Sequence, residues 1–232
     1  MHQSLRTTVC ISVLLTTAAA CSPTIHQHKV AQIRSAAIVG FDAQLPATGH
    51  ASQSAIRADQ AYDQLALSLG TSLGWKITER TELTSHPLYA ASYEHHIQNA
   101  PLGTLGQTMA RLSDDYYPSG IMWSRHAQGL TESERLALMD VLKIDALAIA
   151  HIDVQPCSEH ATEFESSAAY QARLSFEVYD RTTAEPIWAD RWVVGEPSQS
   201  IPTSDPSKLN ASYLEAIEQA YITLFERYQA QE

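Results

Sequence analysis

The order of apolar and polar residues along the first part of the chain predicts a strand, a helix and a second strand. Residues 31–41 contain a near-continuous apolar run, which is typical of a buried strand. Residues 54–73 repeat apolar positions every three or four residues and therefore predict an amphipathic helix. Gly74 suits the end of that helix, and residues 75–79 predict the next strand.

The second half of the chain predicts one helix, three consecutive strands and a final helix. Thr131 and Glu134 have the spacing of a capping box, which starts a helix that ends near residue 142. The strands and the last helix are predicted over residues 145–154, 169–179, 186–194 and 209–229. This order favours an α/β (α+β) fold, with a mixed β-sheet of about five strands, amphipathic helices packed on it and a single domain over residues 30–232.

Residues 81–129 lack a regular pattern and are predicted to form a long loop region, apart from a helix over residues 102–112. Residues 155–167 are polar and are predicted to be a connection. Exposed aromatic side chains in loops often anchor protein interfaces, and packing in the core is the alternative. The candidate protein-binding residues are Tyr89, Tyr93, Tyr116, Tyr117 and Trp123.

The first residues of the chain have the pattern of an export signal, and we predict that this signal covers residues 1–20. Arg6 precedes a short apolar run and the small residues 18–20, and the run is too short to span a bilayer. Cys21 follows directly, so the segment resembles a bacterial lipoprotein signal, in which that thiol is acylated and becomes the new N-terminus. Ordinary secretory cleavage is the alternative. In Gram-negative lipoproteins a residue such as Ser22 at the next position implies the outer membrane, and residues 21–29 are predicted to be a tether.

The composition and the net charge argue against some kinds of binding partner. The chain is 44% hydrophobic and 18% charged, with a formal net charge of −11. An acidic surface argues against nucleic acid or anionic lipid headgroups as the main partner. No other apolar run approaches the length of a membrane span either. Cys10 would leave with the signal, so Cys157 has no internal partner if Cys21 is acylated; otherwise a disulfide between Cys21 and Cys157 stays open.

Several segments resemble one family of envelope domains. Residues 35–42 are similar to the opening strand of the family that contains the curli-secretion lipoprotein CsgG. Related domains are the N-terminal domain of TolB and the lipoprotein activator of penicillin-binding proteins. Residues 75–80, 143–150 and 175–188 resemble later strands and a hairpin of that family. The resemblance implies an α/β domain that works in the cell envelope.

Few residues in the sequence suggest a metal site or a catalytic site. His86, Glu94 and the pair His95 and His96 suggest a metal site, but adjacent histidines point in different directions and a solvated loop is the better interpretation.

Two further groups carry titratable side chains. Cys157, Glu159 and His160 form a fragment with too few ligands for zinc. His151 and Asp153 share one face of a predicted strand and could perform acid–base chemistry, although a histidine on the sheet surface is more common. We therefore expect no cofactor, no metal and no enzymatic activity.

These patterns favour a non-catalytic lipoprotein on the periplasmic face of the outer membrane. Its membrane contact would be the lipid anchor at Cys21, and its domain would bind another envelope protein or assemble with identical chains as a homo-oligomer. A component of a secretion pore resembling the curli lipoprotein is one alternative. A metal-dependent hydrolase built on His151 and Asp153 is another.

Overall fold

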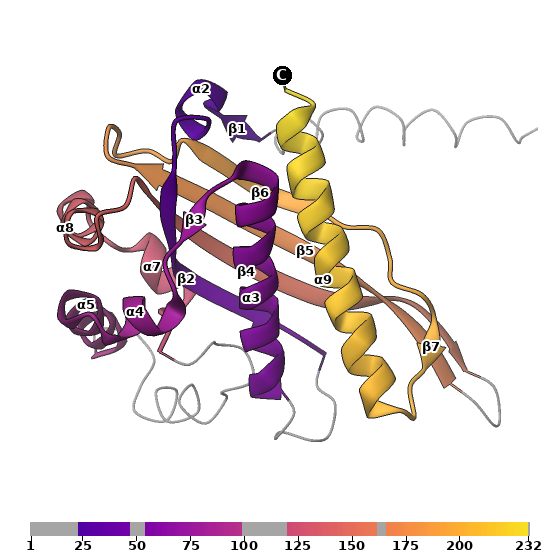
Figure 1. Ribbon diagram of the computed structural model, residues 1–232. Coiled ribbons are helices and arrows are strands. Elements are labelled where there is room, and N and C mark those ends of the chain that lie inside the picture. Colours follow the sequence, from indigo (N-terminus) through magenta and orange to yellow (C-terminus); the bar gives the residue numbers. More distant parts are fainter. Residues whose placement is uncertain (1–22, 47–53, 99–119, 162–165, 232) are drawn as a thin grey trace, which may run out of the picture.

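A computed structural model describes residues 23–46, 54–98, 120–161 and 166–231 (Figure 1). Cys21, Tyr116, Tyr117 and the helix predicted over residues 102–112 lie outside the described residues. The predicted fold class is confirmed, because helices pack on one mixed sheet. Within the described residues the sheet contains seven strands rather than about five.

The sheet has the strand order β1-β6-β5-β4-β2-β3, and β7 pairs with β5 beside this path. β2 is parallel to β3 and β4, and the other pairings between the described strands are antiparallel. The strands are β1 (Thr24–Ile25), β2 (Ser35–Gln44), β3 (Lys76–Ile77), β4 (Ala146–Ala161), β5 (Ser166–Asp180), β6 (Trp188–Val194) and β7 (Ile201–Pro202).

Two long helices, α3 (Ser54–Leu73) and α9 (Pro206–Gln229), cover one face of the sheet (Figure 1). Trp188 of β6 is fully buried beneath α9, with its ring stacked on Tyr228 at a centroid distance of 5.0 Å. The Tyr221 hydroxyl donates to the Ala61 carbonyl over 2.9 Å and thereby joins α9 to α3. The bulk of the aromatic core therefore lies between this helix pair and the sheet.

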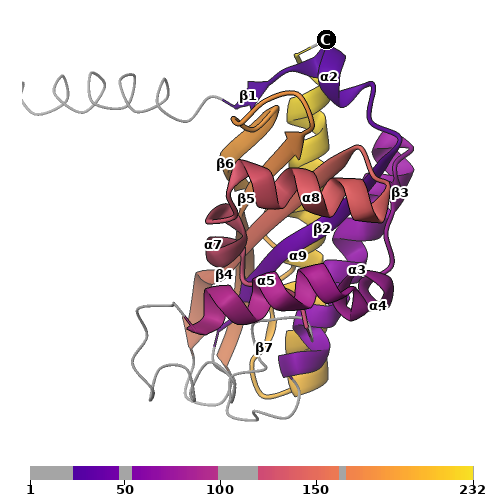
Figure 2. The same cartoon turned by 90° about the vertical axis from the view of Figure 1, so that its left-hand side faces the viewer.

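Shorter helices lie on the other side of the sheet (Figure 2). They are α4 (Arg80–Ser85), α5 (Pro87–Gln98), α7 (Ser124–Gln128) and α8 (Glu132–Leu142). Because helices cover both sides of β2, its residues 36–43 are all buried, as the continuous apolar run predicts.

Two predicted helices agree closely with the structure. α3 spans the residues that the apolar repeat predicts. At the start of α8, the Thr131 hydroxyl accepts from the Glu134 amide, and the Glu134 carboxylate accepts from the Thr131 amide over 2.7 Å. The capping box is therefore confirmed.

The prediction of a long loop region over residues 81–129 is wrong for its described parts, 81–98 and 120–129, because α4, α5 and α7 occupy much of them. Pro87 is the first residue of α5, the helical position that tolerates proline because its missing N–H would have no intrahelical partner. The prediction of a polar connection over residues 155–167 is also wrong, since β4 and β5 continue through much of this range as a hairpin. Backbone pairing sustains these strands without apolar side chains, and Gln155 is exposed.

The tether predicted over residues 21–29 is wrong for residues 24–29, which belong to the folded domain. Thr24 pairs with Ala189 of β6, and a short helix, α2 (Gln27–Val30), follows. Val30 and Ile33 are buried in the core, which explains why a segment with few apolar residues is nevertheless ordered. Because α2 and the buried Ile33 precede it, the strand predicted from residue 31 begins only at Ser35.

We predict that Gly40→Ala destabilises the domain by about 1–3 kcal/mol, the cost typical of overpacking. A Cβ atom on Gly40 would lie 2.3 Å from the Ala127 Cβ and 3.3 Å from the Ser124 Cα, so α7 would have to move away from β2. Urea unfolding of both proteins measures the difference.

Gly70→Ala is the matched control, because its Cβ would meet only the Trp75 carbonyl oxygen at 3.4 Å. Alanine in the interior of α3 should leave stability unchanged or raise it. Equal stabilities of the Gly40→Ala variant and the unmodified protein would contradict the close packing of α7 on β2.

Candidate functional site

The strand register gathers polar side chains on the side of the sheet that faces away from α3 and α9. Asp42 of β2 lies beside His151 of β4, and Ser175 of β5 lies opposite His151. Arg173 lies opposite Asp153 in the same way. Directly paired residues point to one face, so these side chains share it. We call Asp42, His151, Asp153, Arg173, Ser175 and the adjoining Trp192 the polar sheet face.

Asp42 occupies a buried position between β4 and α7. Its Oδ1 accepts a hydrogen bond from the Ser124 amide over 3.0 Å, at the first residue of α7. Its Oδ2 contacts the Nδ1 atom of His151, and the two side chains form an ion pair when the imidazole is protonated. The Asp42 side chain is 9% exposed and the His151 side chain is 36% exposed. The carboxylate is thus fixed in place, while part of the imidazole faces solvent.

The Asp42 carboxylate controls the protonation of His151. Its hydrogen bond raises the pKa of the His151 imidazole above the ordinary value of 6.5, and burial of the ring opposes this shift. The negative charges of Asp42 and Asp153 raise the pKa further. A carboxylate that holds Nδ1 orients the imidazole so that Nε2 is the atom available for exchanging protons.

The site holds an acid–base pair without further chemical machinery among the described residues. In that part of the chain, no serine or cysteine side chain hydrogen-bonds to the His151 ring. Nor do the described residues contain a group of three or more His, Cys, Asp or Glu side chains that could hold a metal ion.

A second network lies on the same side of the sheet, toward β6. The buried Glu177 carboxylate accepts from Arg191 Nε over 3.1 Å and from the Tyr179 hydroxyl over 2.7 Å. Burial and the hydrogen bond to Glu177 raise the pKa of the Tyr179 phenol. The Arg173 guanidinium lies 5.2 Å from the centroid of the Trp192 ring, and Trp192 is 51% exposed. Cationic and aromatic side chains are therefore presented to solvent on a supported backbone.

Two of the predicted interface aromatics are core residues. Tyr89 is completely buried; its hydroxyl donates to the Val39 carbonyl and accepts from the Met122 amide, both over 2.7 Å. Trp123 is 8% exposed and stacks on His126 with centroids 4.6 Å apart. Their assignment to an exposed binding surface is wrong, because both rings pack where the segments around α5 and α7 meet β2.

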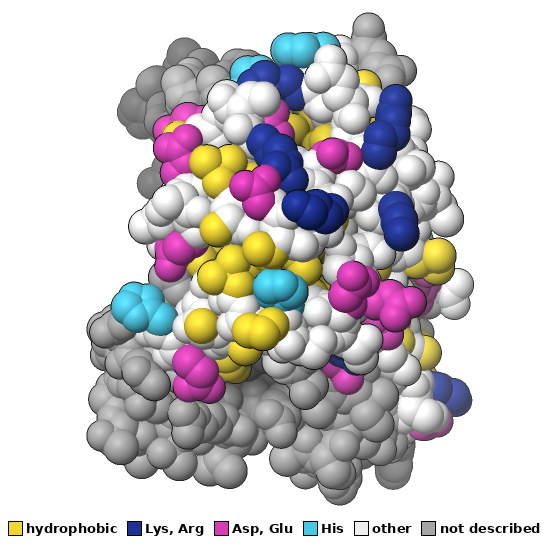
Figure 3. All heavy atoms as spheres, turned by 60° about the vertical axis from the view of Figure 1, so that its left-hand side comes forward, with side chains coloured by type: hydrophobic (Ala, Val, Ile, Leu, Met, Phe, Trp, Pro, Cys, Tyr) yellow, Lys and Arg dark blue, Asp and Glu magenta, His cyan; other side chains and the backbone are white. Residues whose placement is uncertain are grey.

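Tyr93 is half-buried on α5 and belongs to a different, apolar surface. Figure 3 shows hydrophobic side chains gathered around a histidine on the side of the molecule that bears α5 and α8. Partly buried apolar residues of these two helices pack against the core there, namely Leu88, Tyr93, Leu136 and Leu142.

Asp42 is the site residue that the sequence interpretation missed. It ends the buried apolar run of β2, and a charged residue at that point is a local signal. Its partner lies 109 residues further along the chain, so only the pairing of β2 with β4 identifies the contact. Asp153 lies two residues beyond His151 on the same face, as predicted.

Comparisons with known proteins show no family for this chain. No protein-family model matches it, and no curated protein matches its sequence. Among solved structures it is similar to lipoprotein GNA1162 from Neisseria meningitidis, with 12% identity and a TM-score of 0.34 over 79% of this chain and 94% of that one. A similarity of this size does not establish a common fold or function. Among the described helices, none has both the length and the apolar character needed to cross a bilayer.

We predict that His151 gives the free energy of unfolding a specific pH dependence. Because the pKa is raised in the folded state, the stabilisation is complete below about pH 6.5, the value in the unfolded chain, and is lost as pH rises through the folded pKa. His151→Gln should remove this loss. Asp42→Asn should also remove it and lower stability by about 1–3 kcal/mol, because the ring and the Ser124 amide lose a charged partner.

Urea unfolding from about pH 5 to about pH 9 tests this prediction, since this range spans the titration of histidine. His28→Gln, at an exposed position on α2, is the matched control and should retain the pH dependence of the unmodified protein. Parallel stability curves for the unmodified protein and His151→Gln would contradict the role of Asp42.

Proposed function

We propose that the chain is a lipoprotein of the outer membrane, anchored through Cys21, whose periplasmic domain is a non-catalytic module that binds another envelope protein. The signal pattern of residues 1–20 and the position of Cys21 support the anchor. Ser22 after the cysteine supports the outer membrane as its location. Several acyl chains on one residue would hold the domain stably, whereas a single chain holds only marginally.

The observation that supports the binding function best is a group of three side chains, the exposed Trp192 and half-buried Arg173 of the polar sheet face and the exposed Arg191 beside them. Tryptophan and arginine are the side chains that most often dominate the energy of a protein interface. Trp192 is 51% exposed, and the Arg191 side chain is 76% exposed. Arg173 lies against the indole ring, and Glu177 holds Arg191, so both guanidinium groups have partners on the sheet.

This arrangement would favour binding of a partner, because Arg173 and Arg191 have little side-chain entropy left to lose on association. Each immobilised long side chain costs about 0.5–1.5 kcal/mol on association. The contacts already made by Arg173 and Arg191 reduce that cost. Acidic or aromatic groups on the partner would complement the two guanidinium groups and the indole.

Acid–base catalysis at His151 is the second candidate function, and the contact between Asp42 and His151 favours it. An imidazole oriented by a carboxylate and partly open to solvent can serve as a general base. Reaction at this site would still require a nucleophile from water or from the substrate. Loss of a measurable hydrolytic activity in His151→Gln, with unchanged capture of a protein partner, would support this candidate over the binding module.

We predict that a photo-crosslinking residue at position 192 captures an envelope protein in intact cells, and that Arg173→Glu weakens the capture several-fold by reversing a charge beside the indole. Position 67 provides the matched control. Leu67 of α3 is 67% exposed on the opposite side of the sheet, and it should capture no partner. Mass spectrometry of the crosslinked bands measures both results.

Equal capture at positions 192 and 67 would contradict a specific interface on the polar sheet face. Capture of identical chains alone at position 192 would replace the module with a self-assembling protein.

We predict that the mature protein carries acyl chains on Cys21 and lacks residues 1–20. Cys21→Ser removes the thiol that would be acylated and should release the protein from the membrane fraction. Intact mass and the mass of the N-terminal peptide measure both changes. A mature N-terminus with an unmodified Cys21 would favour ordinary secretion, and reduction followed by alkylation would then reveal any disulfide to Cys157.

A further inference from the structure

The folded domain begins almost immediately after Cys21. β1 starts at Thr24, only three residues beyond the cysteine. An extended chain covers at most about 3.3–3.6 Å per residue, so the Cα atom of Thr24 lies within about 11 Å of that of Cys21. The polar headgroup region of a bilayer has a comparable thickness, about 5–8 Å on each side. An acyl anchor at Cys21 therefore leaves the sheet edge little room to move away from the membrane.

The first described residues are fixed to the domain by contacts with distant parts of the chain. The His26 amide donates to the Ile187 carbonyl over 2.8 Å, next to β6. The Gln27 side chain donates to the Tyr228 carbonyl over 3.0 Å, near the end of α9. The orientation of this segment therefore fixes the orientation of the whole domain.

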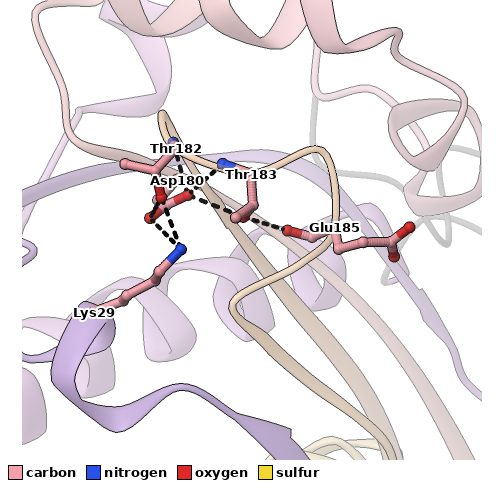
Figure 4. Close-up of polar contacts among 5 residues, drawn as sticks. All are labelled: Lys29, Asp180, Thr182, Thr183 and Glu185. Atoms are coloured by element: carbon pink, nitrogen blue, oxygen red, sulfur yellow. Dashed lines mark hydrogen bonds and ion pairs between the residues drawn. The ribbon is translucent and has the colours of Figure 1, made fainter.

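Lys29 of α2 fastens this segment to the turn between β5 and β6 (Figure 4). Its Nζ donates to the Thr182 hydroxyl over 2.8 Å and lies 3.9 Å from Asp180 Oδ2. Asp180 also accepts from the Thr182 and Thr183 amides, which holds the turn in shape. Figure 1 shows α2, β1 and the C-terminal end of α9 at one end of the molecule and β7 at the other.

The charge of this segment is opposite to that of the protein as a whole. No acidic residue occurs between Cys21 and Asp42, although the chain has a formal net charge of −11. The same stretch contains Lys29 and Arg34 as well as two histidines, and Arg34 is exposed. Basic groups next to a lipid anchor are attracted to anionic headgroups by about 1 kcal/mol each.

We propose that the end of the domain formed by β1, α2 and the β5–β6 turn lies on the membrane, with the exposed Arg34 side chain against anionic lipid headgroups. This docking surface rests on the proposed acylation of Cys21. It directs β7 and the outer end of the β4–β5 hairpin away from the lipid. The short connection and the local positive charge both act to keep this orientation, so the domain does not tumble freely on its anchor.

The test measures how close two positions lie to the lipid in the full-length, acylated protein. Gln32→Cys follows α2, and Ser200→Cys precedes β7; both positions are exposed. Each variant carries Cys157→Ser, since Cys157 is an exposed free thiol. A fluorophore on the new cysteine is quenched by nitroxide headgroups in vesicles of phosphatidylethanolamine and phosphatidylglycerol. We expect several-fold stronger quenching at position 32 than at position 200.

A spacer variant separates the short connection from the charge. About 20 Gly and Ser residues inserted between Ser22 and Pro23 would have a root-mean-square span of about 25 Å. In vesicles of neutral lipid alone, quenching at position 32 should then fall to the level at position 200. Addition of phosphatidylglycerol should restore part of it, because the basic segment is attracted to anionic headgroups.

The outcomes distinguish this proposal from the proposed function. Equal quenching at positions 32 and 200 in a protein whose mass confirms acylation would overturn the orientation and leave the lipoprotein assignment intact. Absence of acyl chains on Cys21 would overturn both. Undiminished quenching of the spacer variant in neutral vesicles would overturn the role of the short connection.

Discussion

The parallel pairing of β2 with β4 is the constraint on which the rest of the structure depends. A carboxylate fixes where this pairing starts. Asp145 Oδ2 accepts hydrogen bonds from the Arg34 and Ser35 amides, both over 2.9 Å, and from the Ser35 hydroxyl over 3.0 Å. Burial alone would raise the pKa of Asp145, but these hydrogen bonds lower it, so the group stays ionised. From this start, the register brings Asp42 beside His151.

Charges that the fold buries are matched by partners from other elements. Glu177 is held by Arg191, and Asp42 contacts His151 on the same side of the sheet. On the opposite side, the fully buried Asp190 of β6 lies 3.2 Å from Arg227 of α9. Burial raises the pKa of Asp190, and the charge of Arg227 offsets part of that rise. Removing the basic partner would leave a carboxylate charge in the interior, so these pairs fix how the elements fit together.

The two proposed surfaces have different physical origins. The polar sheet face exists because α7 and α8 cover only part of one side of a wide sheet, which leaves Trp192 and Arg191 exposed among the described residues. The end that we propose to face the membrane is defined by residues 24–30, which fold into the sheet edge immediately after Cys21. One surface would select a partner, and the other would set the direction from which that partner approaches.

The sequence by itself determined the elements whose causes are local. The apolar repeat of α3, the capping box at Thr131 and the buried run of β2 each depend on residues within a few turns of one another, and all three agree with the structure. The tertiary structure decided the elements that rely on distant partners. Residues 24–30 are ordered by β6 and by the end of α9, and Tyr89 is buried by its contacts with Val39 and Met122. The contact between Asp42 and His151 likewise required strand pairing, because no local pattern records which strands become neighbours in a sheet.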